Sequence, residues 1–233
     1  EEATPDITDK GGDNLDKKSF ADFGVTDPIV DALEDKGITH PFPIQALTLG
    51  PALERHDIIG QAKTGTGKTL GFGIPVLEDV IAPDEEGYED LLNPNKPQAL
   101  IILPTRELTK QVAQDLREAA KYLSTRIVEI YGGVAFEPQI EALERGADIV
   151  VGTPGRLIDL LRKGHLHLSG VETVVLDEAD EMLDLGFLPG VEKILARTRA
   201  DRHTMLFSAT MPGAVVALAR RYMTRPTHIR AQD

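Results

Sequence analysis

Short apolar runs rich in β-branched residues recur along the chain and alternate with amphipathic stretches. Most of these runs are continuously apolar, as expected of strands that are buried on both faces of a sheet. They predict strands at 57–61, 98–103, 126–131, 147–152, 172–177, 203–208 and 226–230. Apolar positions at helical spacing predict helices near 27–36, 68–81, 106–123, 136–145, 154–163, 189–199 and 212–223.

This alternation of strands and helices predicts the fold class. It is typical of an α/β protein with a doubly wound, mostly parallel sheet, in which ligands bind beyond the carboxyl ends of the strands. Thr26 stands where it would cap the first helix, and Pro28 falls in the first turn of that helix. The sequence shows no internal repeat, and we expect one domain over residues 19–233.

Two polar segments carry much of the negative charge. The chain has 233 residues and a formal net charge of -13. Residues 1–20 hold six acids and three lysines, and residues 83–98 hold five acids and one lysine. We expect a flexible polar leader at 1–18 and a solvated, flexible acidic loop at 83–98. Because these segments account for about half of the net charge, the total does not exclude a nucleic-acid partner.

Composition limits the class of protein and its compartment. With 41% hydrophobic and 27% charged residues, the chain resembles an ordinary soluble domain. No apolar run approaches the roughly eighteen residues of a membrane span, and no signal peptide precedes the first polar segment. The absence of cysteine excludes disulfides and thiolate metal sites and fits a reducing compartment. We therefore expect a cytoplasmic protein with no membrane partner.

The stretch AKTGTGKT follows a predicted strand and opens a predicted helix. Its glycines let successive backbone N–H groups curl around phosphate oxygens, and the helix N-terminus adds partial positive charge. Lys68 would then reach the β- and γ-phosphates, and the Thr69 hydroxyl would ligate Mg²⁺. Ala62 replaces the first glycine of the strict pattern, and a glycine-rich turn without a ligand is the alternative. The predicted nucleotide-binding residues of this loop are Ala62, Lys63, Thr64, Gly65, Thr66, Gly67, Lys68 and Thr69.

The stretch VVLDEADEML places four carboxylates directly after an apolar run. Like charges this close repel, so they require a compensating cation. A second strand that ends in acid beside a phosphate loop suits magnesium, and Asp177 is predicted to contact the ion. Glu178 is predicted to polarise the attacking water. Mg²⁺ and Lys68 would offset the repulsion; the alternative is a solvated acidic helix start, which accounts for Glu181.

Together these motifs resemble the DEAD-box ATP-dependent RNA helicases of superfamily two, whose name-giving sequence stands at 177–180. The resemblance implies a RecA-like P-loop domain that uses ATP and Mg²⁺. Ile38 and Thr109 depart from residues that are usual in the family. The remaining elements are Phe20, seventeen residues before the Q-motif-like GITHPFPIQ (37–45); PTRELTKQ (104–111), like motif Ia; Gly132–Gly133, like the GG motif; TPGR (153–156), like motif Ib; and SAT (208–210), like motif III.

The resemblance also implies roles around the nucleotide. The Gln45 amide would read the adenine edge and select ATP, and Phe20 would stack on the adenine face. The alternative is that Gln45 is a residue on the surface of a helix and that the Phe20 side chain packs against the hydrophobic core. Ser208 and Thr210 would hydrogen-bond the DEAD carboxylates and link nucleotide state to RNA engagement; the alternative is a hydroxyl-rich strand end. The predicted catalytic residues are Lys68, Asp177, Glu178, Ser208 and Thr210.

By the same resemblance, Arg106, Gly133, Thr153 and Arg156 would contact RNA. Contacts to phosphates and sugars ignore base identity, so sequence-independent binding is expected. Gly133 would allow a close backbone approach. The alternative for each arginine is a surface salt bridge, which for Arg106 would involve Glu107. The lack of clustered lysine predicts weak affinity and strong salt dependence.

Members of this family hydrolyse ATP between two tandem domains, the second of which supplies arginines. The chain contains no HRxGR-like segment. The resemblance therefore implies an amino-terminal half whose partner is the second helicase domain of the same polypeptide. Alone it is expected to bind nucleotide and RNA weakly, without efficient turnover. Two other functions stay open: a different P-loop enzyme, such as a small-molecule kinase or DNA translocase, and a non-catalytic RNA or protein adaptor.

Overall fold

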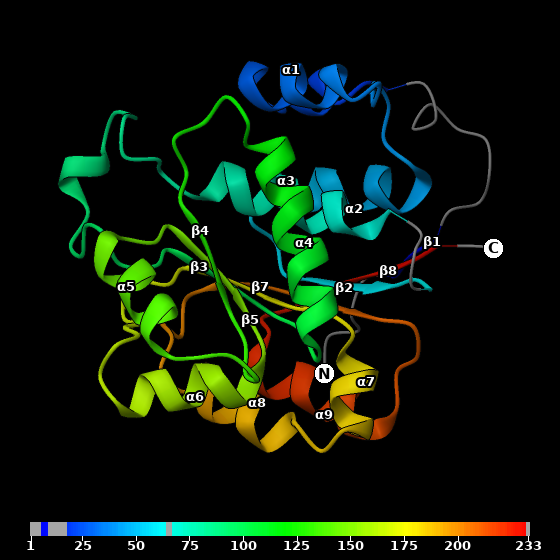
Figure 1. Ribbon diagram of the computed structural model, residues 1–233. Helices are drawn as coiled ribbons and strands as arrows, with labels where there is room; N and C mark the ends of the chain where they lie inside the picture. The colour runs from blue at the N-terminus through cyan, green and yellow to red at the C-terminus, as the bar shows by residue number, and fades with distance from the viewer. Residues whose placement is uncertain (1–5, 9–17, 64–66, 232–233) are drawn as a thin grey trace.

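The computed structural model describes residues 6–8, 18–63 and 67–231, which form a layered α/β domain (Figure 1). Its strands make one sheet in the order β1-β8-β2-β7-β6-β3-β5-β4, and all neighbours are parallel. This confirms the doubly wound parallel sheet. The strands are β1 (Asp6–Thr8), β2 (Ile58–Gln61), β3 (Ala99–Ile102), β4 (Ile127–Ile130), β5 (Ile149–Gly152), β6 (Thr173–Leu176), β7 (His203–Ser208) and β8 (Thr227–Arg230).

Every predicted strand and helix is present, with ends that differ by at most four residues. Two helices, α2 and α7, and the edge strand β1 are not predicted from the sequence. The α-helices in the described residues are α1 (Asp27–Asp35), α2 (Pro43–Leu53), α3 (Lys68–Asp79), α4 (Arg106–Ala119), α5 (Glu137–Arg145), α6 (Pro154–Arg162), α7 (Ala179–Asp184), α8 (Leu188–Leu195) and α9 (Gly213–Tyr222). Each of these helices is too short or too polar to cross a membrane.

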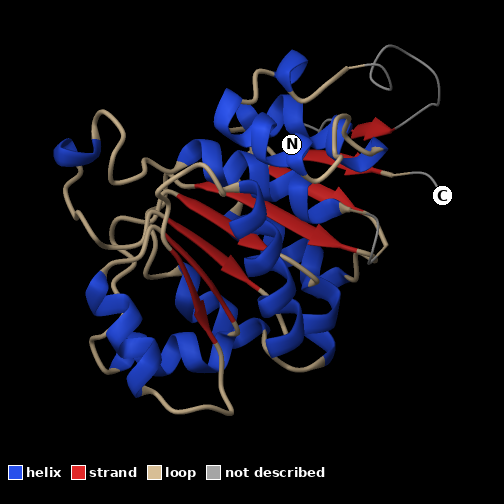
Figure 2. Cartoon of the chain, turned by 45° about the horizontal axis from the view of Figure 1, so that its top comes forward, coloured by secondary structure: helices blue, strands red, loops and turns tan. Residues whose placement is uncertain are grey.

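Helices cover both faces of the sheet (Figure 2), α1 to α4 on one face and α5 to α9 on the other. The side chains between the helices and the sheet form two hydrophobic layers, one on each face. Successive residues of a strand point to opposite faces, so Ala99 and Ile101 of β3 join the first layer, and Leu100 and Ile102 join the second. Burial on both faces is why the strands are continuously apolar.

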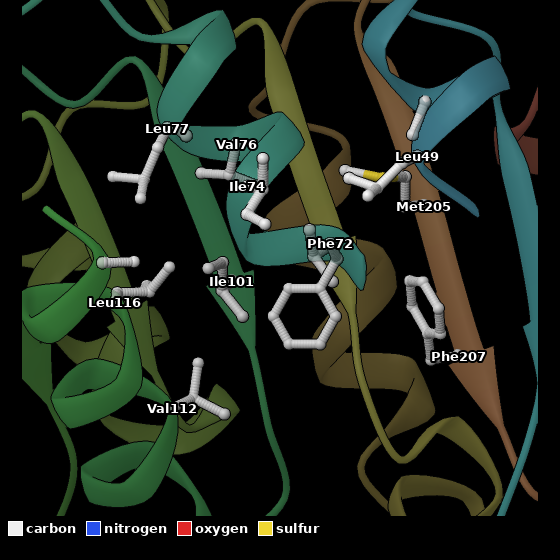
Figure 3. Packing of buried hydrophobic residues seen from close by; sticks show 14 of the residues in the cluster. Leu49, Phe72, Ile74, Val76, Leu77, Ile101, Val112, Leu116, Met205 and Phe207 are labelled. Carbon is white, nitrogen blue, oxygen red and sulfur yellow. The ribbon is translucent and has the colours of Figure 1, made fainter. Parts of the chain in front are cut away.

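Close packing inside the first layer depends on a small residue in β2. The Phe72 ring of α3 packs against the Phe207 ring of β7, with centroids 5.3 Å apart (Figure 3). A Cβ atom at Gly60, in the adjacent strand, would overlap the Phe207 ring. The glycine therefore leaves the space that this ring fills, directly beneath the end of β2 that leads to the phosphate loop.

Described residues in both acidic segments make contacts with the rest of the domain. Within the predicted leader, β1 pairs with β8, and residues 1–5 and 9–17 lie outside the described residues. In the acidic loop, Arg126 donates to the Tyr88 hydroxyl (2.9 Å) and to Asn95 Oδ1 (3.0 Å), and is itself paired with Asp148. The loop is thus tied to the domain, although its acidic side chains are exposed.

The first helix begins where the sequence predicts, but its cap differs. Thr26 occupies the N-cap position and Pro28 the first turn of α1. The Thr26 hydroxyl makes no capping bond; it donates to Glu78 Oε1 of α3 at 2.6 Å, and the Thr26 N–H donates to the same oxygen at 3.0 Å. This residue therefore ties α1 to α3 instead of capping its own helix.

Candidate functional site

The candidate site lies at the carboxyl edge of the sheet, where three neighbouring strands end. In the sheet order, β7 separates β2 from β6. Their last residues are Gln61, Leu176 and Ser208, each followed by one of the motif segments. Parallel strands bring these segments to the same edge, although they are far apart in the sequence.

Lys68 is the first residue of α3 and lies between two carboxylates. Its Nζ atom is 2.7 Å from Glu178 Oε1 and 3.1 Å from Asp177 Oδ1. Gly67 precedes it with φ of 75°, a left-handed conformation that glycine adopts without strain. The Lys68 residue is only 5% exposed. The structure therefore brings together the ammonium group and the acid that the sequence separates.

Burial and charge set the protonation of this cluster. Burial raises the pKa of Asp177 to about 6, Lys68 opposes the rise and Glu178 adds to it. Burial also lowers the pKa of Lys68, but Asp177 and Glu178 outweigh burial, so the Lys68 pKa lies above its ordinary value. At neutral pH the cation and the Asp177 anion coexist. Lys68 is thus the cation that compensates the acidic strand end.

The turn from β6 into α7 stores backbone strain at Glu178. This residue has φ of 54° and ψ of 47°, a left-handed conformation that is uncommon without glycine. Its N–H donates to Asp177 Oδ1 at 2.9 Å, and its carboxylate accepts from Lys68. Strained residues persist where surrounding contacts hold them, and they cluster at functional sites.

The end of β7 is bonded to the start of α7. The Thr210 hydroxyl donates to Asp180 Oδ2 at 2.8 Å, and the Thr210 N–H donates to the same oxygen at 3.0 Å. Burial raises the pKa of Asp180, but these bonds outweigh it and leave the pKa below its ordinary value. The Ser208 hydroxyl accepts from the Asp180 N–H (3.0 Å) and donates to the Thr210 carbonyl. Thr210 therefore bonds a DEAD carboxylate. Ser208 bonds the backbone on both sides, and its side-chain hydrogen bond to Asp180 also helps to lower the pKa of that carboxyl.

Gln45 joins α2 to the phosphate loop. Its Oε1 accepts from the Phe42 N–H at 2.9 Å, and its Nε2 donates to the Gly67 carbonyl at 2.5 Å. Gln45 is buried, which rules out the helix-surface alternative. An amide group has two N–H donors and two acceptor lone pairs, so one donor and one acceptor stay available for a ligand.

A cavity of about 300 Å³ opens beside these groups, at the lower end of the usual size for ligand sites. Ala62 is buried at the strand end, Lys63 is exposed, and neither lines the cavity. The predicted residues Thr64, Gly65 and Thr66 lie outside the described residues. The predicted residues that line the cavity are Gln45, Gly67, Lys68, Thr69, Asp177 and Glu178.

Phe20 packs in the core instead of facing the cavity, which corrects the prediction that it stacks on adenine. Its side chain is 1% exposed and belongs to the hydrophobic layer formed with α1 to α4. Its position is that of the alternative, a side chain that packs against the hydrophobic core. The aromatic residue next to Gln45 in the cavity wall is Phe42, which is 61% exposed. Sequence reasoning missed Phe42, although it lies inside the Q-motif-like segment.

The donor set fits magnesium but not a metal held by protein alone. Among the described residues, no group of three or more His, Asp or Glu side chains is arranged to hold an ion. Mg²⁺ in phosphate sites typically takes one or two carboxylates, with phosphates and waters supplying the rest. The Asp177 carboxylate and the Thr69 hydroxyl, both in the cavity wall, match that partial set.

Three of the four predicted RNA residues meet in a second hollow at the same edge of the sheet, and the fourth, Gly133, is not in its wall. It has a volume of about 400 Å³, and Arg106, Thr153 and Arg156 contribute to its wall. Arg106 lies over the Tyr131 ring, 5.0 Å from its centroid. Within the described part of the chain, no ion pair joins Arg106 to Glu107, so the salt-bridge alternative is not met. Tyr131, another residue that sequence reasoning missed, ends a predicted strand directly before Gly132.

Arg156 is directed inward more than the prediction assumed. It is 9% exposed, and its guanidinium lies 3.9 Å from the Phe136 ring centroid. It donates to the Val134 carbonyl at 2.8 Å and to Gln139 Oε1 at 3.2 Å. Arg156 therefore holds the loop that carries Gly133. That glycine has φ of 80° and is exposed, as a close backbone approach requires.

Comparisons with known proteins agree on one family. Residues 42–218 match the family model described as DEAD/DEAH box helicase. The chain is 50% identical over 218 residues to the DEAD-box ATP-dependent RNA helicase 3B, chloroplastic, of Zea mays, covering 94% of this chain and 29% of that protein. It is 44% identical over 214 residues to the DEAD-box ATP-dependent RNA helicase CshA of Bacillus cereus, covering 92% of this chain and 39% of that protein.

Solved structures give the same result. The crystal structure of a DEAD box protein from the hyperthermophile Methanococcus jannaschii matches with a TM-score of 0.84 and 40% identity, over 92% of this chain and 56% of that one. A hypothetical ATP-dependent RNA helicase from Sulfolobus tokodaii matches with a TM-score of 0.75 and 37% identity, over 88% and 56%. The chain spans about a third of the length of the curated relatives and about half of the solved ones.

Proposed function

The chain belongs to the DEAD/DEAH box helicase family, and on that premise we propose that it is the ATP-binding half of an ATP-dependent RNA helicase. Its partner would be the second helicase domain of the same polypeptide, and its substrate would be RNA held through the backbone. The full unit would couple Mg-ATP binding and hydrolysis to local duplex unwinding or remodelling of RNA–protein complexes. This half alone would bind both ligands weakly.

One observation carries the proposal: Lys68, Asp177 and Glu178 converge in the wall of a single cavity. In the family pattern the lysine binds phosphates, so Lys68 would exchange its carboxylate partners for the β- and γ-phosphates of ATP. The ammonium is already desolvated and positioned at the N-terminus of α3, where the helix dipole also favours an anion. Binding therefore requires a change of partner more than a large movement.

The acids take complementary parts in this mechanism. Asp177 and Thr69 would hold Mg²⁺, which when bound supplies positive charge to the phosphate oxygens. Release of Lys68 frees Glu178 Oε1, which would accept a proton from the attacking water. Turnover would still require arginines from the second domain, since the charge on the transferring phosphate needs further stabilisation.

The base and the RNA would be recognised by separate parts. The remaining donor and acceptor of Gln45 would pair with the adenine edge, and the exposed Phe42 ring is the aromatic surface available next to it. At the second hollow, Arg106 and the backbone near Gly133 and Thr153 would contact phosphates and sugars without reading bases. We place the protein in the cytoplasm, a reducing compartment that the lack of cysteine fits and in which RNA is available.

Nucleotide binding gives the direct test. ATP and GTP titrations against the wild type, Lys68→Ala and Gln45→Ala should show tighter ATP binding, loss of that binding in Lys68→Ala, and loss of selectivity in Gln45→Ala. Equal ATP and GTP affinity in the wild type would favour a different P-loop enzyme. Unchanged nucleotide affinity in Lys68→Ala would favour a non-catalytic adaptor.

Hydrolysis tests the division between two domains. RNA-stimulated ATP hydrolysis should be measured with the full-length protein and with this chain in parallel. We expect stimulation by RNA in the full-length protein and little turnover in the chain alone. Efficient RNA-stimulated hydrolysis by the chain alone would contradict the proposal that it is half of the active unit.

A further inference from the structure

Helices α6 and α8 lie side by side on the face of the sheet covered by α5 to α9 (Figure 1). A third hollow lies between these two helices. Its volume is about 330 Å³. Arg162, Lys193 and Arg197 in its wall are exposed, and across the described residues the structure records no ion pair or hydrogen bond for these three side chains. The wall consists of Ile158, Leu161, Arg162, Lys193, Ala196 and Arg197. Three cations without partners are the feature that requires explanation.

This third hollow is adjacent to the second hollow at the RNA-facing edge, and the two share one lining residue. Helices α6 and α8 pack against each other, and the seam is tight at Gly190, where a Cβ atom would lie 3.0 Å from Ile158 Cδ1. Ile158 lines both hollows. Gly190 and Pro154, near the starts of the two helices, line the second hollow. The seam therefore leads from one hollow to the other along the helix pair.

The two hollows share an unusual charge. The chain carries a net charge of -13, yet no Asp or Glu is among the residues that line either hollow. The one acidic residue of α8, Glu192, forms an ion pair with Arg221, with 2.8 Å between Glu192 Oε1 and the Arg221 guanidinium. Two adjacent cationic hollows on an acidic protein are the electrostatic footprint expected for a polyanion.

We propose that a single strand of RNA held at the second hollow continues along the α6–α8 seam, where Arg162, Lys193 and Arg197 bind its phosphates. This inference rests on the proposed RNA binding near Arg106. From Thr153 to Arg162 the helix rises by roughly 14 Å, so the second set of cations would engage nucleotides beyond those at the first. The contacts would be to phosphate, so they would extend the site without adding base preference.

Length-dependent binding separates this site from the first one. Fluorescence anisotropy would be measured with oligouridylates about 4 and about 12 nucleotides long, which span typical single-strand site sizes. In the variant Arg162→Gln/Lys193→Gln/Arg197→Gln, we expect the longer RNA to bind about tenfold more weakly at low salt and the salt slope to fall by about 2. The shorter RNA should bind as it does to the wild type.

A matched variant controls for the loss of three charges. Lys96→Gln/Arg145→Gln/Arg220→Gln makes the same change in charge outside both hollows, and it should bind both RNAs as the wild type does. If the two triple variants weaken binding of the longer RNA equally, the inference that RNA binds along the α6–α8 seam is wrong. The inference is also wrong if the variant Arg162→Gln/Lys193→Gln/Arg197→Gln binds the longer RNA as the wild type does and unfolds at the same temperature.

The remaining arms distinguish this inference from the function on which it rests. Arg106→Ala should weaken the binding of both RNAs. If it does so while the seam variant has no effect, the inference that RNA binds along the seam is wrong and the proposed function stands. If neither variant affects either RNA, both fail. A seam variant that keeps RNA affinity but loses binding to a polyglutamate peptide would assign the cations to an acidic polypeptide and overturn the inference.

Discussion

The Lys68 ammonium lies 2.7 Å from Glu178 Oε1, although 110 residues separate the two in the chain. The pair is buried, and both partners line the cavity. Without a ligand, the carboxylates already satisfy the lysine. A nucleotide must therefore compete for this ammonium, and release of the nucleotide restores the ion pair. The same contact thus influences both stability and affinity.

Lys68→Ala should destabilise the protein as well as abolish nucleotide binding. It leaves Asp177 and Glu178 buried without their cation, which typically costs about 3–5 kcal/mol. The loss should be larger at pH 8 than at pH 5, because Asp177, whose pKa is about 6 in the folded protein, is protonated at pH 5 and then needs no cation. Denaturant unfolding at the two pH values measures this. Lys121→Ala, which breaks the exposed pair with Asp35, is the control and should cost less than about 1 kcal/mol.

Asp177→Asn should raise the stability of the unliganded protein at neutral pH. The pKa of Asp177 is about 6 in the folded state and 3.8 ordinarily, so between these values the folded state binds more protons. The contribution of Asp177 to the free energy of unfolding therefore decreases as pH rises through this window. The variant should gain about 1–3 kcal/mol at pH 7.5 and nothing below pH 4.

The same substitution should remove the magnesium-dependent part of ATP affinity. In the wild type, that part should weaken as pH falls through about 6, since a protonated carboxyl group is a poor ligand for the ion. Calorimetric titrations of ATP with and without Mg²⁺ at pH 5 and 7.5 test this. A magnesium dependence that is identical at both pH values would contradict the assignment of Asp177.

Thr210→Val should weaken the connection between β7 and α7. It removes one hydrogen bond to Asp180, worth about 1 kcal/mol. The pKa of Asp180 is lowered in the folded state, so this contribution is present above the ordinary value of 3.8 and is lost as pH falls through the folded value. Thermal unfolding should therefore separate the variant from the wild type at pH 7, and the difference should shrink as pH falls below 3.8. Thr198→Val, remote from the site, is the control.

The two aromatic residues near the Q-motif-like segment should behave oppositely. Phe20→Ala removes a buried ring and should cost about 3–5 kcal/mol in unfolding free energy. Phe42→Ala removes an exposed ring and should leave stability nearly unchanged while weakening ATP binding several-fold. Urea unfolding and ATP titration on both variants give the comparison. Normal ATP affinity in Phe42→Ala would exclude the ring from base recognition.

Gly60→Ala should be destabilising for reasons of space alone. The new methyl group would overlap the Phe207 ring, and overpacking of this kind costs about 1–3 kcal/mol. Gly50→Ala in α2 is the matched control, because nothing lies within 4 Å of its Cβ position and alanine favours the helix. Unfolding midpoints of the two variants should move in opposite directions.

Most of the fold follows from the sequence because the sheet is buried on both faces. A short, continuously apolar run such as 98–103 is best buried as a central strand, where both faces of the strand are covered. Helix α2 was missed because it is apolar nearly all round and has no polar face to set a helical period. Helix α7 has only six residues, too few to show any period.

The site was predictable where strand ends determine position. Lys68 and Asp177 come together because both follow parallel strands, a relation that the sequence contains. Side-chain direction is different: nothing local indicates that Phe20 is buried, Phe42 exposed or Arg156 directed inward. Those outcomes depend on packing between segments that are distant in the sequence, such as the contact of Arg156 with Val134.

The anchored acidic loop gives the molecule an electrical polarity. The acidic loop leads into the start of β3, and Arg106 lies four residues beyond the end of that strand, so β3, about 13 Å long, runs from the end that carries the acidic loop to the end that carries Arg106. Because Arg126 fixes the loop at the opposite edge, a polyanion that approaches from that end meets repulsion. Encounter is thereby biased toward one orientation before any specific contact forms.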